Sequence, residues 1–266
     1  MKDMCTDLSA EYAELAALAD TLSAEQWRMD TAFYGWTSWD EIAHLSYFDE
    51  TSLLAVSDAA AFAADAAELG QALAQGREIS AIARERYGHL DGAQLLAHWR
   101  GRSAALCAAL AGLEAKARLP WYGPTMSARS FATARLMETW AHGQDVFDAL
   151  RRPRQPTKRL KHIAQLGVAT FAWSFVNRRL PVPEQPPHVE LVAPDGEIWR
   201  WNPPSAEAYV KGSAEDFCLV VTQRRHLADT GLKLAGEAAP RWLAIAQCFA
   251  GAAADGPAPG LRKIAP

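Results

Sequence analysis

The sequence predicts a mainly α-helical protein in which a helical bundle is followed by a small α+β domain. Up to about residue 178, apolar residues recur with the 3.6-residue period of amphipathic helices. After residue 180, four prolines fall within seven residues, and short apolar runs between turn residues replace the helical period. We therefore expect the bundle at residues 1–180, the α+β domain at 181–254 and a flexible tail at 255–266.

The first two helices are expected at about residues 8–22 and 38–57. In the first, leucine, alanine and tyrosine side chains recur on one stripe, which would form its buried face. In the second, Ser38 lies three residues before Glu41, the spacing of a capping box. This spacing predicts that the second helix begins there.

Three further helices complete the expected bundle. Asp91 lies three residues before Gln94, so a third long helix is predicted to open with a capping box. A fourth is expected at residues 127–150, where Pro153 follows closely, and a fifth at 157–178. Short connections between antiparallel helices would favour an up-down bundle.

Strand and helix signals alternate in the second domain. Pro194, Asp195 and Gly196 separate two apolar runs, which predicts a β-hairpin. The expected elements are strands at residues 188–193, 197–201 and 231–234, and helices at 214–224 and 240–249.

Composition and charge exclude several classes of function. The 266 residues carry a formal net charge of −4, so no strong positive field would attract nucleic acid or an anionic membrane. The chain has no apolar run of the length of a membrane span, and its N-terminus is acidic where a secretory signal would be basic and then apolar. The four cysteines are far apart and form no CxxC pair. We expect a cytoplasmic protein with reduced thiols that binds neither nucleic acid nor membranes.

The residues that could carry chemistry lie on the second and fourth predicted helices. Glu138 and His142 are four residues apart, so one helical turn places them on the same face. If the helix that carries His44 faces them, the three side chains form a two-histidine, one-carboxylate set for a divalent metal. Such a set leaves coordination positions open, as in a catalytic site. The alternatives are an exposed Glu138–His142 pair and a histidine that packs in the core.

Other residues near these motifs are candidates for supporting roles. Asp145 follows His142 by three residues and is expected to accept a hydrogen bond from an imidazole N–H, with a solvated helix charge as the alternative. Aromatic residues flank both motifs and could wall a pocket for an apolar or aromatic substrate, with core packing as the alternative for each. These residues are Trp36, Trp39, Trp121, Tyr122 and Trp140.

Two segments resemble the metal-binding motifs of the DinB/YfiT-like superfamily. Trp36–Leu45 is similar to its "GWT…dvlaHL" segment, and Met137–Val146 is similar to the paired "E…aHg.Dv" segment. Together they resemble the N-terminal domain of the maleylpyruvate isomerase family, in particular an actinobacterial branch described only as metal-binding. The turn at 194–196 and the segment Val210–Phe217 resemble that group's C-terminal domain, which has a sterol-carrier-like α+β fold.

This resemblance covers nearly the whole chain and implies both a fold and a site. The fold is a DinB-like up-down four-helix bundle followed by the small α+β domain. The site consists of His44, Glu138 and His142 around a divalent metal, with zinc as the first expectation and nickel or iron as alternatives. A low-molecular-weight thiol, mycothiol, is implied as cosubstrate, with its thiolate on the metal. An arginine of the second domain faces the metal in this family, and Arg224 is the expected residue, with Arg225 as the alternative.

Three functional hypotheses remain from the sequence. The first is a metal- and thiol-dependent isomerase or S-transferase that acts on a small electrophilic substrate. The second is a non-catalytic metal-binding protein of the same fold, and the third is a polar core cluster without a metal. The enzyme hypothesis requires an acid, a base or an anion anchor near the open metal positions. The Arg224 guanidinium would suit a carboxylate of substrate or thiol, with a solvated or structural arginine as the alternative.

Overall fold

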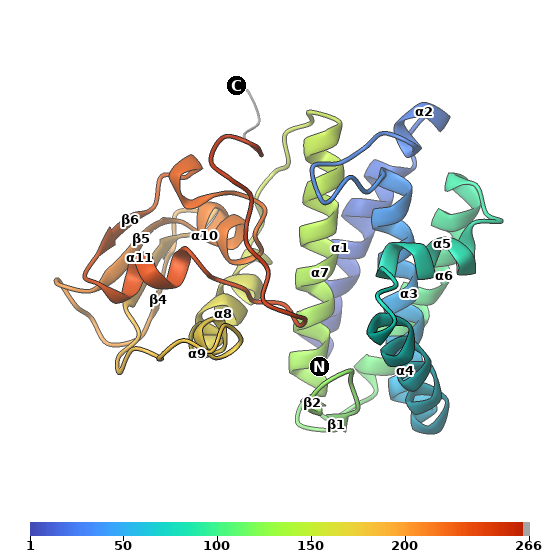
Figure 1. Ribbon diagram of the computed structural model, residues 1–266, viewed down its shortest axis with the longest axis horizontal. Coiled ribbons are helices and arrows are strands. Elements are labelled where there is room, and N and C mark those ends of the chain that lie inside the picture. The colour runs from blue at the N-terminus through green and yellow to red at the C-terminus, as the bar shows by residue number, and fades with distance from the viewer. Residues whose placement is uncertain (263–266) are drawn as a thin grey trace. The chain divides into compact units, whose positions relative to one another are not determined.

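The structure is a computed structural model that describes residues 1–262. It divides into two compact units, Met1–Arg152 and Pro153–Pro266 (Figure 1). This division differs from the boundary predicted at residue 180, because residues 153–180 belong with the second unit. Among the described residues, no helix is long and apolar enough to cross a membrane.

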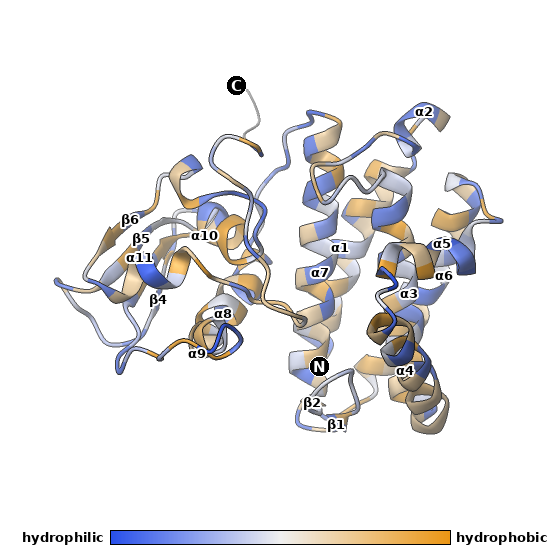
Figure 2. Ribbon diagram, viewed as in Figure 1, coloured by the Kyte–Doolittle hydropathy of each residue, from blue (hydrophilic) through white to orange (hydrophobic). Residues whose placement is uncertain are grey.

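Four long helices form the first unit. They are α1 (Lys2–Ala19), α3 (Ser38–Ser57), α6 (Gly92–Ala111) and α7 (Ala128–Ala149). Both α1 and α3 pack against α6 and against α7, so the four helices enclose one core. Figure 2 shows hydrophobic residues interspersed with hydrophilic ones along α1 and α7. The predicted four-helix bundle is confirmed.

The connections between the long helices carry elements of their own. They are α2 (Ala24–Trp27), α4 (Ala59–Ala74), α5 (Ile79–Tyr87) and an antiparallel pair of short strands, β1 (Arg118–Leu119) and β2 (Met126–Ser127). These elements replace the short connections that the sequence analysis expected. α4 was not predicted; it is rich in alanine, and its buried residues are only Phe62 and Leu69.

The start of α3 differs by one residue from the predicted capping box at Ser38 and Glu41. Thr37 is the N-cap: its hydroxyl accepts the Asp40 N–H at 3.2 Å, and the Asp40 carboxylate accepts the Thr37 N–H at 2.9 Å. Asp40 also accepts two hydrogen bonds of 2.7 Å from Arg84 on α5. Because Asp40 fills the capping role, the fully buried Glu41 side chain is available for another partner.

A buried carboxylate joins the four helices of the bundle. Asp49 of α3 accepts hydrogen bonds from Tyr12 of α1 at 2.7 Å, from Trp99 of α6 at 2.8 Å and from Arg135 of α7 at 2.8 Å. Each helix contributes one residue to this network. A shift of any helix would therefore leave a buried polar group without its partner, which is costly.

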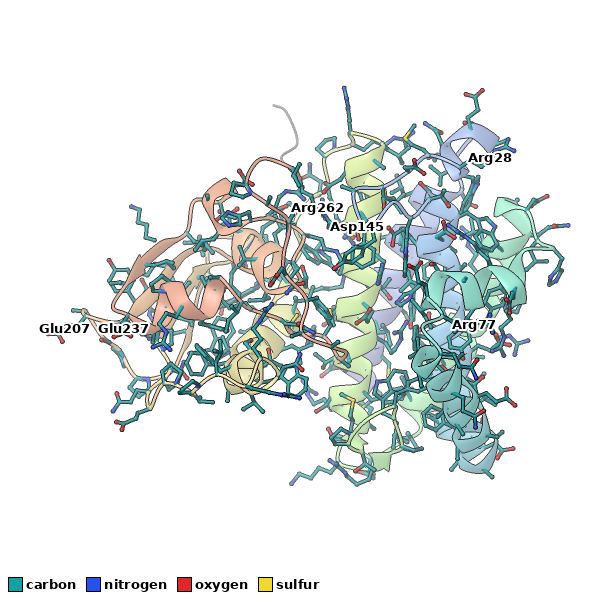
Figure 3. The ribbon with its side chains drawn as sticks, viewed as in Figure 1. Arg28, Arg77, Asp145, Glu207, Glu237 and Arg262 are labelled. Carbon is teal, nitrogen blue, oxygen red and sulfur yellow. The ribbon has the colours of Figure 1, made fainter. Side chains whose placement is uncertain are left out.

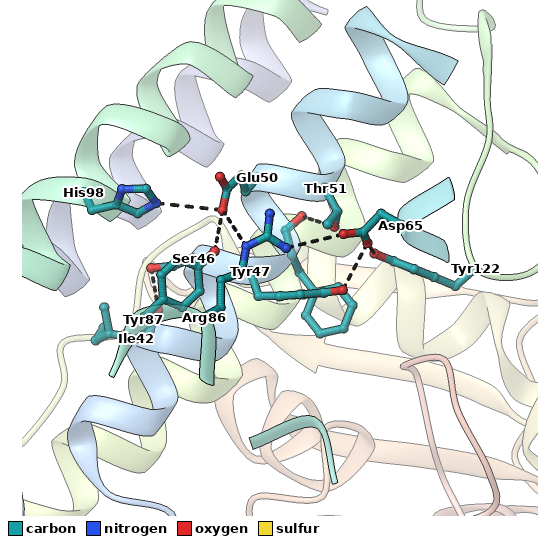
Figure 4. A network of polar contacts seen from close by, with 11 residues as sticks. Ile42, Ser46, Tyr47, Glu50, Thr51, Asp65, Arg86, Tyr87, His98 and Tyr122 are labelled. Carbon is teal, nitrogen blue, oxygen red and sulfur yellow. Dashed lines mark hydrogen bonds and ion pairs between the residues drawn. The ribbon is translucent and has the colours of Figure 1, made fainter. Parts of the chain in front are cut away.

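A second polar network attaches α4 and α5 to α3 (Figure 4). Asp65 of α4 accepts hydrogen bonds from Tyr47 of α3 at 3.0 Å and from Tyr122 of the β1–β2 connection at 3.1 Å. Arg86 of α5 pairs with Asp65 at 3.3 Å and with Glu50 of α3 at 3.5 Å. These polar contacts supplement the few buried apolar side chains of α4.

The second unit contains a four-stranded mixed sheet in the order β4-β3-β5-β6. The strands are β3 (His188–Val192), β4 (Ile198–Trp201), β5 (Tyr209–Ser213) and β6 (Lys233–Ala235). β3 pairs antiparallel with β4 and parallel with β5, and β5 pairs antiparallel with β6. The predicted hairpin is present, and Gly196 in its turn has a φ of +86°, a conformation that favours glycine. The strand β5 was not predicted.

The helices of this unit explain where the unit boundary lies. The predicted helix at 157–178 is divided into α8 (Leu160–Ala169) and α9 (Phe171–Val176), and the later helices are α10 (Ala214–Val221) and α11 (Ala238–Leu243). α8 packs against α10 at Gly167, where an added Cβ would lie 2.8 Å from Val221 Cγ2 and 3.0 Å from Phe217 Cε1. This close packing assigns α8 to the second unit.

The segment predicted as a flexible tail is held against the second unit as far as residue 262. Asp255 pairs with Arg178 at 2.9 Å, and the Gly260 N–H donates to Asp229 at 2.7 Å. The Gln223 amide also donates to the carbonyl of Ala254, the residue before this segment. The structure therefore differs from the predicted tail at residues 255–262, and residues 263–266 lie outside the described part of the chain.

Candidate metal centre

The three predicted ligands meet between α3 and α7. His44 lies on α3, and Glu138 and His142 lie one helical turn apart on α7, which packs against α3. One ligand atom of each residue lies within 4.8 Å of the other two. His142 is buried, while His44 and Glu138 are half-buried. The structure thus brings together the side chains that the sequence predicted on separate helices.

Two imidazole nitrogens converge on one carboxylate oxygen. Glu138 Oε2 lies 3.6 Å from His44 Nε2 and 3.3 Å from His142 Nε2. Ligand atoms bound at 2.0–2.2 Å to a tetrahedral ion are about 3.3–3.6 Å apart. The donors therefore have the spacing that a zinc-type ion requires, and two imidazoles with one carboxylate are a donor set that such ions bind.

The Glu138 carboxyl group is held in its ionised form. Burial opposes ionisation, but hydrogen bonds with His142 and His44, together with their electrostatic attraction, outweigh it. The pKa of Glu138 is consequently well below its usual range. The hydrogen bonds and the attraction require protons on the two imidazoles, and a cation bound between the three side chains would take the place of those protons.

The second ring nitrogen of His142 has a partner that the sequence analysis did not assign to the site. His142 Nδ1 lies 2.6 Å from Glu41 Oε2, and the Thr31 hydroxyl donates to Glu41 Oε1 at 2.7 Å. A carboxylate on Nδ1 favours the tautomer whose Nε2 lone pair faces the metal position. Helical spacing could have indicated Glu41, because it precedes His44 by three residues and so shares a face of α3 with it.

Asp145 lies beside the centre, on the same helix as His142. Its role as an acceptor for an imidazole N–H stays a prediction. Asp145 is buried, and one of its oxygens lies within 4.8 Å of the ligand atoms of Glu41 and His142. Figure 3 labels Asp145 on α7. Its burial excludes the alternative of a solvated helix charge.

Aromatic rings enclose the two histidines. Trp36 stacks on His142 with ring centroids 5.8 Å apart and an interplanar angle of 11°, and its centroid lies 5.2 Å from that of His44. Phe33 lies edge-on to His142 with ring centroids 5.2 Å apart, and the ring centroids of Phe48 and His44 are 4.7 Å apart. Trp36 was a predicted wall residue, whereas Phe33 and Phe48 were missed because neither belongs to a recognised motif.

The other predicted aromatic residues take different positions. The ring centroids of Trp121 and Phe48 are 6.2 Å apart, so Trp121 lies next to a ring that itself contacts His44. Trp39 donates its indole N–H to the Leu90 carbonyl at 3.2 Å, in the connection between α5 and α6. Trp140 is buried on α7, and Tyr122 belongs to the network around Asp65 described above.

Arg224 lies in the second unit, directly after α10. Its side chain is buried, and Nη1 donates to the Thr222 carbonyl at 2.8 Å. Gln223, which precedes it, has a φ of +60° and ends the helix in the left-handed conformation. Arg225, the alternative anchor, is also buried and donates to the Arg224 carbonyl at 2.7 Å. The role of Arg224 toward the metal centre stays a prediction.

The bundle and its small companion domain define the class of this protein. Residues 8–147 match the family described as the mycothiol maleylpyruvate isomerase N-terminal domain. This match spans more than half of the chain, and the chain belongs to that family.

Two relatives support this assignment, and two solved structures share the fold. The chain is 44% identical over 250 residues to the uncharacterized proteins MT0041 and Rv0036c of Mycobacterium tuberculosis, covering 92% of this chain and 94% of each relative. Crystal structures of the mycothiol-dependent maleylpyruvate isomerase and of its mutant have TM-scores of 0.52 and 0.54. They share 16% and 14% sequence identity and cover 82% of this chain and 87% of theirs, so the likeness shows the fold.

Proposed function

We propose that this protein is a metal-dependent enzyme that uses a low-molecular-weight thiol to isomerise a small electrophilic substrate or to transfer the thiol to it. The proposal depends above all on the convergence of His44, Glu138 and His142 at the spacing of metal ligands. Zinc suits this donor set, with nickel or iron as alternatives. Mycothiol is the proposed thiol, because the matched family and the structurally similar isomerase both carry it in their names.

Each residue of the centre has a distinct task in this proposal. Glu138 supplies the negative charge, and His44 and His142 supply neutral nitrogen donors, so three protein ligands leave a position for a guest. When bound, a divalent ion would lower the pKa of a coordinated thiol or water and so supply a nucleophile at neutral pH. Trp36 and Phe33 shield His142 from water on two sides, which strengthens electrostatic interactions there.

We further assign to Arg224 the binding of a carboxylate of the substrate or thiol. Guanidinium groups form paired hydrogen bonds with carboxylates, and a buried guanidinium binds them more strongly than an exposed one. We also place the enzyme in the cytoplasm, where thiols stay reduced, because its four cysteines are buried as thiols.

Calorimetry tests the thiol. Metal-loaded protein is titrated with mycothiol and, separately, with glutathione, and we expect binding heat with mycothiol. No heat with either thiol would favour the alternative function, a non-catalytic metal-binding protein of the same fold.

An assay with maleylpyruvate as probe substrate tests the reaction. Turnover should require both metal and mycothiol. Arg224→Gln should lower kcat/KM by about 10–100-fold, mainly through KM, because it removes an interaction with a substrate or thiol carboxylate. Its metal content should stay that of the wild type. Unchanged kinetics in this variant would remove Arg224 from the site, and Arg225→Gln is the matched comparison.

A further inference from the structure

A short loop closes over one side of the candidate metal centre. We call residues 30–37 the aromatic loop. Asp30 and Thr37 form an antiparallel bridge at its ends, and the Thr31 N–H donates to the Trp36 carbonyl at 2.6 Å. At its tip, Tyr34 and Gly35 have φ angles of +51° and +70°. These contacts give the loop a defined conformation between α2 and α3.

The Thr31 side chain links this loop to the metal ligand His142. Its hydroxyl accepts the Phe33 N–H at 3.2 Å within the loop and donates its proton to Glu41 Oε1 at 2.7 Å. Glu41 Oε2 in turn lies 2.6 Å from His142 Nδ1. One continuous chain of hydrogen bonds therefore runs from the loop backbone to the ligand ring, and Thr31, Glu41 and His142 are all buried.

The same loop contacts the ligand ring by a second route. Trp36 stacks on His142, and Phe33 meets its edge. The orientation of the imidazole thus depends on the loop through two ring contacts and through Glu41. A loop displaced from this position would give up these contacts together.

We propose that Thr31 and Glu41 are positioning residues for His142, and that they couple the aromatic loop to metal binding. Glu41 fixes the tautomer and orientation of the ring, and Thr31 fixes Glu41. Metal affinity is therefore higher when the loop is closed, and a bound metal orders the loop by the same factor. This inference rests on the proposed function, since it requires a metal on His142 Nε2.

Metal affinity tests the positioning role. The wild type, Glu41→Gln and Thr31→Val are titrated with Zn²⁺ against a chromophoric chelator. We expect affinity to fall by about 10–100-fold in Glu41→Gln and by a smaller factor in Thr31→Val, as for other partners of metal-bound histidines. Thr31→Ser keeps the hydroxyl and should bind within about twofold of the wild type.

The matched control is Thr133→Val, which removes a hydroxyl that donates to the Arg129 carbonyl within α7. It should bind Zn²⁺ as the wild type does. Far-UV circular dichroism and thermal unfolding of each metal-free variant confirm that it is folded. If Glu41→Gln fails to fold, the comparison of Thr31→Val with Thr31→Ser still tests the same hydrogen-bond chain.

Hydrogen exchange tests the coupling. In the wild type, Zn²⁺ should slow exchange of the loop amides, in particular those of Thr31 and Trp36. In Thr31→Val this metal-dependent protection should shrink, whereas a purely structural Thr31 would alter exchange equally with and without metal.

The measurements distinguish failure of the positioning role from failure of the proposed metal site. Wild-type affinity in both Glu41→Gln and Thr31→Val, with metal lost in His142→Ala, would overturn the positioning role and leave the proposed metal site intact. Absence of Zn²⁺ binding by the wild type itself would overturn the proposed function, and this inference with it.

Discussion

Three carboxylates of α3 have different tasks because their positions give them different partners. Asp40 caps the helix and pairs with Arg84. Glu41 binds the ring of His142. Asp49, two turns further along the helix, accepts hydrogen bonds from residues of the other three long helices. One helix thus supplies a cap, a support for the metal centre and the central acceptor of the core.

The pairing of Asp40 predicts a pH-dependent contribution to stability. Burial would raise the pKa of this carboxyl, but hydrogen bonds from Arg84 and Thr37 outweigh burial and lower it. The stabilisation is therefore complete above the unfolded pKa of about 3.9 and is lost as pH falls through the lower native pKa. Asp40→Asn should reduce the free energy of unfolding by about 1–2 kcal/mol at neutral pH.

Urea denaturation of wild type and Asp40→Asn at neutral pH and at about pH 3 measures this difference. The gap between the two proteins should narrow at the lower pH. Arg84→Ala is the comparison. It should lower the free energy of unfolding by less than Asp40→Asn does, because the Arg84 side chain is 54% exposed. A gap that stays constant across this range would contradict the low native pKa.

Single residues also show what the sequence could reveal about the site. Glu138 and His142 share a helix, so their spacing placed them on one face. His44 joined them on the condition that its helix faces theirs, and the motif resemblance then implied all three as ligands. Glu41 was missed because its spacing from Ser38 also fits a capping box, and local spacing cannot decide between two roles. Only the packing of α3 on α7 brings Glu41 to His142.

At the scale of elements, α4 and α5 depend on polar contacts more than the long helices do. Asp65 is the common acceptor for Tyr47, Tyr122 and Arg86 (Figure 4). Asp65→Asn should lower the free energy of unfolding by about 1–3 kcal/mol, because one acceptor would be replaced by a donor group facing other donors. Denaturation measures this loss.

Hydrogen exchange should locate the same effect. In Asp65→Asn, the amides of α4 and α5 should exchange faster while those of α1 and α7 change little. Glu68→Gln alters an exposed carboxylate of the same helix and should leave stability within about 0.5 kcal/mol of the wild type. Uniform acceleration across the bundle would show that the Asp65 network supports the whole unit.

The elements also differ in how well their sequences predicted them. α3 and α7 were predicted at residues 38–57 and 127–150, and the structure confirms both helices. The start of α6 follows from the Asp91–Gln94 capping box, which is present. α4 was not predicted, and β5 is a central strand whose pairing with β3 and β6 comes from distant segments. Pairing of this kind leaves no local signal.

At the scale of the whole chain, the sequence contains two places that could each mark the boundary between the units. Pro153 ends α7 closely, and a proline-rich stretch follows residue 180. Proline marks interrupted helices and turns in both places, so composition alone could not select between them. The close packing of Gly167 on α10 assigns α8 to the second unit. Because this packing joins residues far apart in the sequence, composition could not reveal it.

Metal removal should destabilise the first unit as a whole. A ligand at about 100 times its Kd adds about 2.7 kcal/mol to the folded state. Removing the ion with a chelator should therefore lower the Tm of this unit by about 5 °C or more, and added Zn²⁺ should restore it. Differential scanning calorimetry measures the shift, and His142→Ala, which lacks a ligand, should show none.

The most direct test of the account is the metal content of the purified protein. Elemental analysis should find about one equivalent of a divalent metal in the wild type, because the three ligands form a single site. His44→Ala, Glu138→Ala and His142→Ala should each lose most of it, while His98→Ala should keep it. Full metal retention in all three ligand variants, or no metal in a wild type supplied with Zn²⁺, would contradict the central claim.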